Sequence, residues 1–176
     1  IGDTAPRGLC GSGLLAAIAE LRRCDVIHRS GRLTPHPLVE AGPDGKKRVV
    51  LDGEHGIVLT QNDVRQVQLA KGAILSGIQT MMRFAGIGPG DIDELLVAGQ
   101  FGAHLKVSSL TGSGMIPAEL GPKVRYVGNT SKSGALLCLL SGDERRRVEE
   151  VAGHIDYIEL SALDGYEKVF VQAMQF

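Results

Sequence analysis

Apolar residues recur at helical spacing over the segment from Thr60 to about Phe84, which is the clearest periodic pattern in the chain. Residues three or four positions apart share one face of a helix, so this segment predicts a long amphipathic helix. Thr60 and Asp63 stand at the spacing of a capping box, and Gly86 is placed to end the helix. The predicted apolar face carries Val67, Ala70, Ile74, Ile78, Met81 and Ala85. The predicted polar face carries Arg65, Gln68, Ser76, Gln79 and Arg83.

Shorter apolar runs predict β-strands. Residues 48–51 and 57–60 are rich in β-branched residues and flank a polar turn, so they predict a hairpin. Residues 95–98 form a short apolar run that is typical of a buried strand, and residues 124–127 repeat the design. Each run is followed by a Gly-rich loop, and two such units in succession favour a parallel sheet with crossover helices. The expected fold class is therefore α/β.

The rest of the chain follows from local composition. Good helix formers follow a Gly-rich turn near the start, and a segment rich in Pro and Gly separates them from the hairpin. The further predicted elements are a helix at 14–21, a surface loop at 30–47, helices at 135–140 and 143–153, a strand at 157–160 and a short terminal helix.

Composition and charge narrow the class of protein. A hydrophobic fraction of 43% is ordinary for a globular domain. The net charge is −1 and no basic stripe is interleaved with aromatic residues, which argues against nucleic-acid binding. No apolar run reaches membrane-spanning length, and the three cysteines are widely spaced, as expected of a cytoplasmic protein without disulfides. The start at Ile1, without Met, is interpreted as a fragment of a longer protein.

Three Gly-rich loops are the candidate binding sites, because ligands of open α/β sheets lie beyond the carboxyl ends of the strands. Each loop also has a structural interpretation. The first, at 8–13, is then a tight turn, Phe101 of the second fills the core, and Asn129 of the third caps a helix. Lys132, in the third loop, is either an anion contact or a solvated side chain. The candidate residues are Gly11, Ser12 and Gly13, then Gly99, Gln100, Phe101 and Gly102, then Gly128 and Asn129.

Other chemistry is less well supported. The five histidines have no paired ligand spacing, so no metal site is expected, and His104 is the one histidine near a candidate loop. Cys10 lies in a Gly-rich turn near a helix start, a position that can lower a thiol pKa, but no neighbouring base is evident. The acidic residues Asp91, Asp93 and Glu94 precede a strand, so they are interpreted as a solvated turn.

Six short motifs occur together and in order, and in this combination the chain resembles the C-terminal region of the reductive activators of corrinoid proteins, including the methyltransferase corrinoid activation proteins. The resemblance spans nearly the whole chain. It departs from the family at Gln100, which is bulkier than usual, at Thr130, Ser131 and Lys132, and at Leu15 or Ala16, where an Asp is frequent. The motifs are those at 8–14, 59–65, 68–71, 97–102, 127–129 and 157–161.

The resemblance implies a ribonuclease-H-like, actin-like ATPase lobe over residues 1–176, with a mixed central sheet and flanking helices. It implies that the parent protein binds ATP with Mg²⁺, carries a 2Fe–2S cluster in an N-terminal ferredoxin-like domain, and returns Co(II) corrinoid proteins to Co(I). The implied partner is a corrinoid protein, and a homodimer is left open. The Gly99–Gly102 loop would lie on the adenosine side of the nucleotide cleft, with phosphate motifs and catalytic residues upstream.

Two alternatives remain at the level of the sequence. One is half of a sugar or acid kinase, which requires a catalytic Asp and a polar substrate pocket. The other is a docking or dimerisation module without its own nucleotide contact. The chain alone is not expected to be active. For the leading interpretation, Gly99→Val is expected to weaken ATP binding with little loss of folding.

Overall fold

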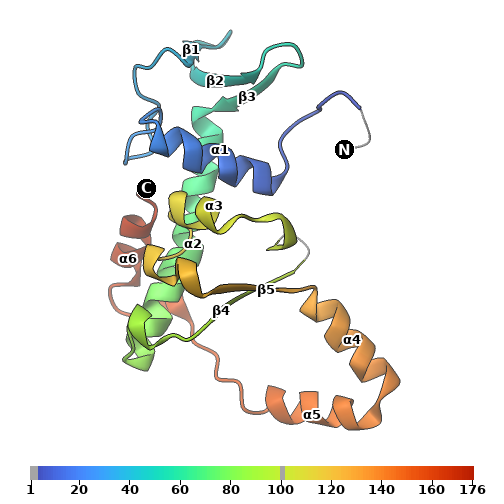
Figure 1. Ribbon diagram of the computed structural model, residues 1–176. Coiled ribbons are helices and arrows are strands. Elements are labelled where there is room, and N and C mark those ends of the chain that lie inside the picture. The colour runs from blue at the N-terminus through green and yellow to red at the C-terminus, as the bar shows by residue number, and fades with distance from the viewer. Residues whose placement is uncertain (1–3, 100–101) are drawn as a thin grey trace.

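The computed structural model describes residues 4–99 and 102–176 (Figure 1). An antiparallel sheet and helix α1 form one end of the molecule, a two-stranded parallel sheet lies toward the other end, and the long helix α2 connects the two. The elements are α1 (Gly11–Arg23), β1 (Val39–Ala41), β2 (Lys47–Asp52), β3 (Ile57–Thr60), α2 (Gln61–Ala85), η1 (Pro89–Asp91), β4 (Leu95–Ala98), η2 (Gly102–His104), α3 (Val107–Gly112), η3 (Ala118–Lys123), β5 (Val124–Gly128), α4 (Thr130–Leu140), α5 (Gly142–Ala152), η4 (Leu160–Ala162) and α6 (Tyr166–Ala173).

The predicted hairpin is confirmed as β2 and β3, which pair antiparallel with Val49 opposite Leu59. Both of these side chains are buried in the core. The segment predicted as a loop also contains a strand, β1, which adds to the outer edge of β2. Glu40 and Arg48 are cross-strand neighbours in this pair and form an ion pair at 2.7 Å. The prediction missed β1 because the three-residue strand is too short to produce an alternating pattern.

Helix α2 begins and ends as predicted. The Thr60 hydroxyl accepts a hydrogen bond from the Asp63 amide at 3.2 Å, and the Thr60 amide donates to the Asp63 carboxylate at 2.8 Å. This reciprocal pair is a capping box, and it satisfies two backbone donors at the start of the helix. Gly86 ends the helix in the left-handed conformation, with φ of 67°.

The predicted burial of α2 was wrong. Ile74 and Met81, assigned to the buried face, are 45% and 47% exposed. Gln68 and Ser76, assigned to the solvent face, are buried instead. The C-terminal segment explains this reversal, because α6 packs along this side of α2 and presents polar backbone groups to it. Gln68 donates a hydrogen bond to one of those backbone groups, and the Ser76 hydroxyl shares one with the Tyr166 hydroxyl of α6, which compensates the burial of both side chains.

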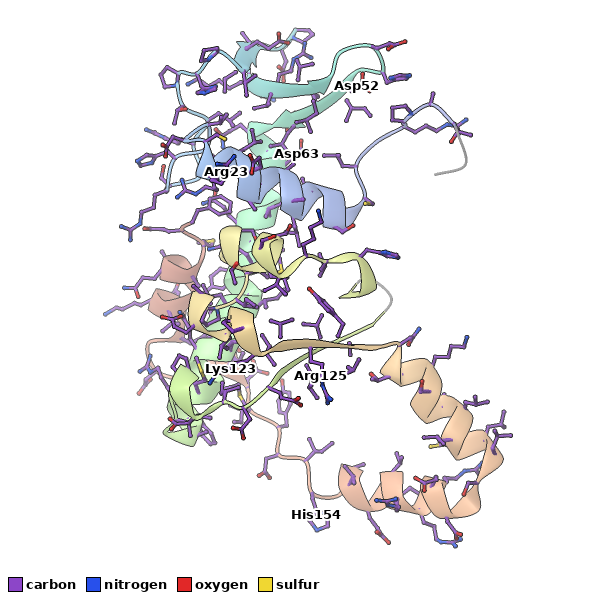
Figure 2. The ribbon with its side chains drawn as sticks, viewed as in Figure 1. Arg23, Asp52, Asp63, Lys123, Arg125 and His154 are labelled. Atoms are coloured by element: carbon purple, nitrogen blue, oxygen red, sulfur yellow. The ribbon has the colours of Figure 1, made fainter. Side chains whose placement is uncertain are left out.

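The parallel sheet is confirmed as β4 and β5, which are joined by a crossover that contains α3. Lys123, at the end of η3, donates to the carbonyl oxygens of Pro89 at 2.8 Å and Gly90 at 3.1 Å, and this ties the start of β5 to the turn before β4 (Figure 2). The α/β class is confirmed, although the described strands form two separate small sheets. Strand β4 is partly exposed along its length, so the predicted burial of residues 95–98 is not found here.

Two boundaries in the second half of the chain differ from the prediction. Helix α4 begins at Thr130 rather than at residue 135, so Asn129 alone separates it from β5. The strand predicted at 157–160 is absent from this described segment. Its end forms a 3-10 turn in which the Glu159 carboxylate accepts hydrogen bonds from the Tyr157 hydroxyl at 2.6 Å and from the Ser161 amide at 3.3 Å. These local side-chain contacts compete with strand pairing. The two helices predicted at 143–153 and at the terminus are confirmed as α5 and α6.

The main core lies where α1, the antiparallel sheet, the first turns of α2 and α3 meet. Its fully buried side chains include Ile18, Val26, Ile27 and Val64. Leu95, Val97 and Val124 pack against this cluster from the parallel sheet. This core fixes the N-terminal end of α1 relative to the carboxyl ends of β4 and β5. Within the described residues, no helix is both long enough and apolar enough to cross a membrane.

Candidate functional site

A hydrogen bond between two glycines connects the carboxyl ends of β4 and β5. The Gly99 amide donates a hydrogen bond to the Gly128 carbonyl oxygen at 2.8 Å. Both residues have positive φ angles, 97° for Gly99 and 72° for Gly128. A side chain at either position would be strained, and a Cβ atom placed there would meet no other atom within 4 Å. The two glycines therefore present bare backbone to open space at the strand ends.

Gly102 has a different role. A Cβ atom at this position would lie 2.9 Å from Cγ1 of Val97, which is closer than packing allows. The Gly102 amide donates to the Gly99 carbonyl oxygen at 3.1 Å, so this residue closes the loop back onto β4. Gly102 is buried and supports the loop. Gln100 and Phe101, the other two predicted residues of this loop, lie outside the described residues.

The first candidate loop is the start of a helix. Gly11, Ser12 and Gly13 form the first turn of α1, three residues earlier than predicted. The Cys10 sulfur caps this turn, because it accepts a hydrogen bond from the Gly13 amide at 3.4 Å. A Cβ atom at Gly8 would meet nothing within 4 Å, so close helix packing does not explain that glycine.

The environment of Cys10 lowers the pKa of its thiol. The largest cause is the hydrogen bond that the thiol shares with the Ser12 hydroxyl at 3.2 Å, and the Gly13 amide is the next. Both contacts stabilise the thiolate. No acidic residue lies in the first turn of α1, so the partial positive charge of the helix start is not neutralised within the turn.

The third loop supports the structural interpretation of its asparagine. The Asn129 side chain accepts a hydrogen bond from the Lys132 amide at 3.1 Å and thereby caps α4. Lys132 lies in the first turn of α4 and is exposed. His104 ends η2 and is also exposed. No group of three or more potential metal ligands occurs among the residues described.

The candidate segments open to one side of the molecule. In Figure 1 the N-terminal end of α1, the turn η2 and the junction of β5 with α4 lie on the same side. A hollow of about 350 Å³ lies beside the first segment, lined by Gly8 and Leu14 and, on the β2–β3 hairpin, by His55 and Ile57 among others. Another hollow, of about 650 Å³ between α1 and α3, is lined by Ala16 and residues C-terminal to it, and none of its lining residues is a candidate residue.

This arrangement can bind a ligand that combines a flat group with an anionic group. Bare backbone at Gly99 and Gly128 allows a ring or sugar to approach closely, and the free amides of a helix start favour an anion. The prediction found the three segments but not the hydrogen bond between Gly99 and Gly128. The signal that could have revealed it is that Gly99 directly follows β4 and Gly128 ends β5, so each strand of the pair has a glycine at its carboxyl end.

Known proteins share both the sequence and the fold. Residues 1–176 match the family described as the C-terminal domain of RACo, the ASKHA domain. The corrinoid activation enzyme RamQ of Eubacterium limosum is 34% identical over 191 residues, which cover 100% of this chain and 32% of RamQ. A solved structure of a reductive activator for corrinoid, iron–sulfur protein superposes with a TM-score of 0.83 at 33% identity, over 95% of this chain and 28% of that protein.

The chain thus spans about a third of the length of these relatives. The full-length family match, the shared fold and the ordered sequence motifs agree with one another, and they confirm the actin-like ATPase class expected from the sequence. The chain belongs to the family of the C-terminal ASKHA domain of the reductive activators of corrinoid proteins.

Proposed function

We propose that this chain is the C-terminal ATPase-fold lobe of a cytoplasmic, ATP-dependent reductive activator that returns Co(II) corrinoid proteins to Co(I). The observation that carries the proposal is the pair of left-handed glycines at the ends of two adjacent parallel strands, in a chain of this family. Both relatives that match over nearly the whole chain have names that refer to corrinoid activation. The kinase alternative gains no support from these observations.

The glycine pair fits an adenine nucleotide. The positions where Cβ atoms would stand at Gly99 and Gly128 have no neighbour within 4 Å, so a purine or ribose could rest against the backbone there. The first turn of α1 would offer the amides of Gly11 and Ser12 to a phosphate, while the Gly13 amide donates to the Cys10 sulfur. ATP with Mg²⁺ would supply the free energy of binding and hydrolysis, and the remaining phosphate contacts would come from upstream residues.

The iron–sulfur cluster would be held elsewhere in the parent protein. The three cysteines of this chain, Cys10, Cys24 and Cys138, are far apart in the sequence and all are free thiols. A 2Fe–2S cluster needs four ligands, usually cysteine thiolates. We therefore place the electron donor in a separate domain, and one electron passes from its reduced cluster to Co(II).

The role of this lobe would be to change the equilibrium between open and closed forms of the nucleotide cleft in the parent protein. A nucleotide favours closure only by the difference in its affinity for the two forms. A coupling free energy of about 1–3 kcal/mol between two sites is typical of allosteric proteins. For a one-electron couple, about 59 mV corresponds to a tenfold change in the equilibrium constant, so coupling of this size can assist the reduction of Co(II) by a moderate amount.

A matched pair of substitutions tests the nucleotide site in the parent protein. Asn tolerates the left-handed conformation, so Gly128→Asn adds a side chain at the proposed contact with little backbone strain. Gly86→Asn is the control, because Gly86 also has a positive φ angle and open space but ends α2, on the side of the molecule where β4 begins and away from the junction of β5 with α4. We expect Gly128→Asn to weaken ATP binding at least about tenfold by calorimetry, a change of about 1.4 kcal/mol, and Gly86→Asn to leave it unchanged.

This pair replaces Gly99→Val, which the structure makes unsuitable. With a φ angle of 97° at Gly99, a β-branched residue would strain the backbone, so the expected small effect on folding was wrong. ATP-dependent loss of the Co(II) electron paramagnetic resonance signal of a corrinoid protein tests the activity itself. Equal ATP affinity of Gly128→Asn and the unmodified protein would contradict the proposed site.

A further inference from the structure

The hollow of about 650 Å³ between α1 and α3 lies outside the candidate nucleotide loops. Its lining on α1 begins at Ala16, whereas the candidate residues of this helix, Gly11 to Gly13, form the first turn. Phe176, at the C-terminal end of the chain, lines the hollow as well. In Figure 1 this end of the chain and the junction of β5 with α4 lie on opposite sides of the molecule. A volume of this size is in the range of small-molecule sites.

Small residues leave this space open. Helices α1 and α3 pack closely, because a Cβ atom at Gly112 would lie only 3.0 Å from that of Ala19. Gly114 has a φ angle of 67°, a conformation that favours glycine, and its backbone forms part of the wall. Ala16 and Ala19 supply short side chains on the α1 side. The body of a ligand can therefore approach both helices closely.

A buried serine of α3 lacks a partner at this hollow. Ser109 is 5% exposed and lines the hollow, and its hydroxyl makes no hydrogen bond to any residue that the structure describes. The neighbouring hydroxyls are satisfied, since Thr111 donates to the Val107 carbonyl oxygen at 3.1 Å and Ser113 to that of Leu110 at 3.3 Å. Buried polar groups are nearly always hydrogen-bonded. A ligand in the hollow can supply the partner that the Ser109 hydroxyl lacks.

The charged side chains of the lining favour an anion. Arg22 donates to the Ile27 carbonyl oxygen, which is its one hydrogen-bond partner in the described chain, so most of its five N–H donors remain available. Glu20 and Arg23 also line the hollow, but they are bound to each other, with Nε of Arg23 at 3.0 Å from the carboxylate. Two cations and one anion leave the lining with a net charge of +1, and the available charge is that of Arg22.

A second cation lies behind the wall of the hollow. A Cβ atom at Gly114 would stand 3.1 Å from Nζ of Lys71, so only the backbone of this glycine separates the buried ammonium group from the hollow. The Phe176 ring lies between the two cations, 5.3 Å from Nζ of Lys71 and 5.8 Å from Cζ of Arg22. Charges interact more strongly in such partly buried surroundings than in water. An anion near this ring would be attracted by both.

We propose that the hollow between α1 and α3 binds a small organic anion. The Ser109 hydroxyl and the Arg22 guanidinium donate hydrogen bonds to its anionic group, and its apolar part lies against Phe176 and the small residues of the two helices. Hydrogen bonds from a guanidinium to an anionic oxygen are among the stronger ones in proteins. This site shares no residue with the proposed nucleotide site, so the inference does not rest on the proposed function.

Binding of para-fluorobenzoate to the parent protein, followed by fluorine nuclear magnetic resonance, tests the inference. Saturating ATP is present, so that the nucleotide site is not available to the probe. We expect a dissociation constant of about 1 mM, as is reasonable for an anion of this size. The uncharged para-fluorobenzamide should bind at least about tenfold more weakly, because it lacks the negative charge. Equal affinity for the two compounds, or no binding of para-fluorobenzoate at concentrations up to about 10 mM, would overturn the inference.

Two pairs of variants locate the bound probe. Ser109→Ala breaks no hydrogen bond of the structure, so it should keep the melting temperature and weaken binding of para-fluorobenzoate about tenfold. Its control is Ser131→Ala, at an exposed serine of α4 outside the lining, which should keep the affinity. Ala16→Leu places a larger side chain on the wall and should abolish binding, whereas Ala73→Leu, at an exposed alanine of α2 outside the lining, should not.

Unchanged affinity in either Ser109→Ala or Ala16→Leu would place the bound probe elsewhere and overturn the inference. The measured quantity is the affinity for para-fluorobenzoate itself. A parent protein that failed to bind ATP would therefore contradict the proposed function and leave this inference standing.

Discussion

The buried lysine of α2 gives the most specific prediction about stability. Lys71 is 1% exposed, and its ammonium group donates hydrogen bonds to the carbonyl oxygen of Ala173 at 2.8 Å and to that of Gln175. The ring of Phe176 lies 5.3 Å from the same nitrogen. Burial, followed by the nearby charge of Arg22, lowers the pKa of Lys71 from 10.5 to about 8. The C-terminal segment is thus held to α2 by hydrogen bonds from the Lys71 ammonium group, whose charged form is disfavoured by burial.

The sign of the pH dependence follows from the two pKa values. Between about pH 8 and 10.5 the unfolded chain holds the lysine proton more tightly than the folded chain, so the free energy of unfolding rises with pH in this window. At 1.36 kcal/mol per pH unit, the whole window corresponds to about 3 kcal/mol. Most of this amount is gained between about pH 7 and 10.

Urea unfolding of the 176-residue chain, followed by circular dichroism at about pH 7, 8.5 and 10, measures this contribution. Lys71→Met removes the titrating group and leaves the two carbonyl oxygens without this donor. The difference in unfolding free energy between the unmodified chain and Lys71→Met should therefore rise by about 2 to 3 kcal/mol from pH 7 to 10. Lys47→Met is the control, because Lys47 is exposed and donates to a single carbonyl oxygen, that of Leu33, at 3.1 Å.

A flat difference between the unmodified chain and Lys71→Met across this range would refute the argument. It would mean that Lys71 keeps its proton equally well in the folded and unfolded chains. The same result would show that its two carbonyl contacts fully compensate the burial of the charge. A parallel rise for Lys47→Met would refute it as well, since the slope would then not belong to the buried lysine.

Three further predictions concern the helix start, the candidate loop and the exposed thiol. Thr60→Ala removes the capping box of α2 and should lower the unfolding free energy by about 1 kcal/mol in urea titrations. Gly102→Ala places a Cβ atom 2.9 Å from Val97 and should lower the melting temperature, whereas Gly134→Ala, in open space on α4, should not. Cys10 should react with iodoacetamide at lower pH than Cys24 does, because hydrogen bonds to its sulfur lower the thiol pKa, and Ser12→Ala should reduce that difference.

Elements whose causes are local could be predicted from the amino-acid sequence. The capping box at Thr60 and Asp63 and the stop at Gly86 fixed the bounds of α2, because these interactions lie within a few residues of one another. The same holds for the hairpin and for the strands β4 and β5. The family also followed from short motifs, because backbone contacts at strand ends and helix starts restrict residue type locally.

Contacts between residues distant in sequence determine which surfaces are buried and which loops meet. The spacing of α2 predicted the helix but not its buried side, because Gln68, Lys71 and Ser76 are buried against the C-terminal segment, about a hundred residues away along the chain. Likewise, the sequence indicated two separate Gly-rich loops at Gly99 and Gly128. The parallel pairing of β4 with β5 brings these two glycines within hydrogen-bonding distance. Hydrophobic periodicity indicates which face of a segment is apolar enough to be buried. The residues that actually cover the segment are distant in sequence, and the pattern of one segment contains no information about them.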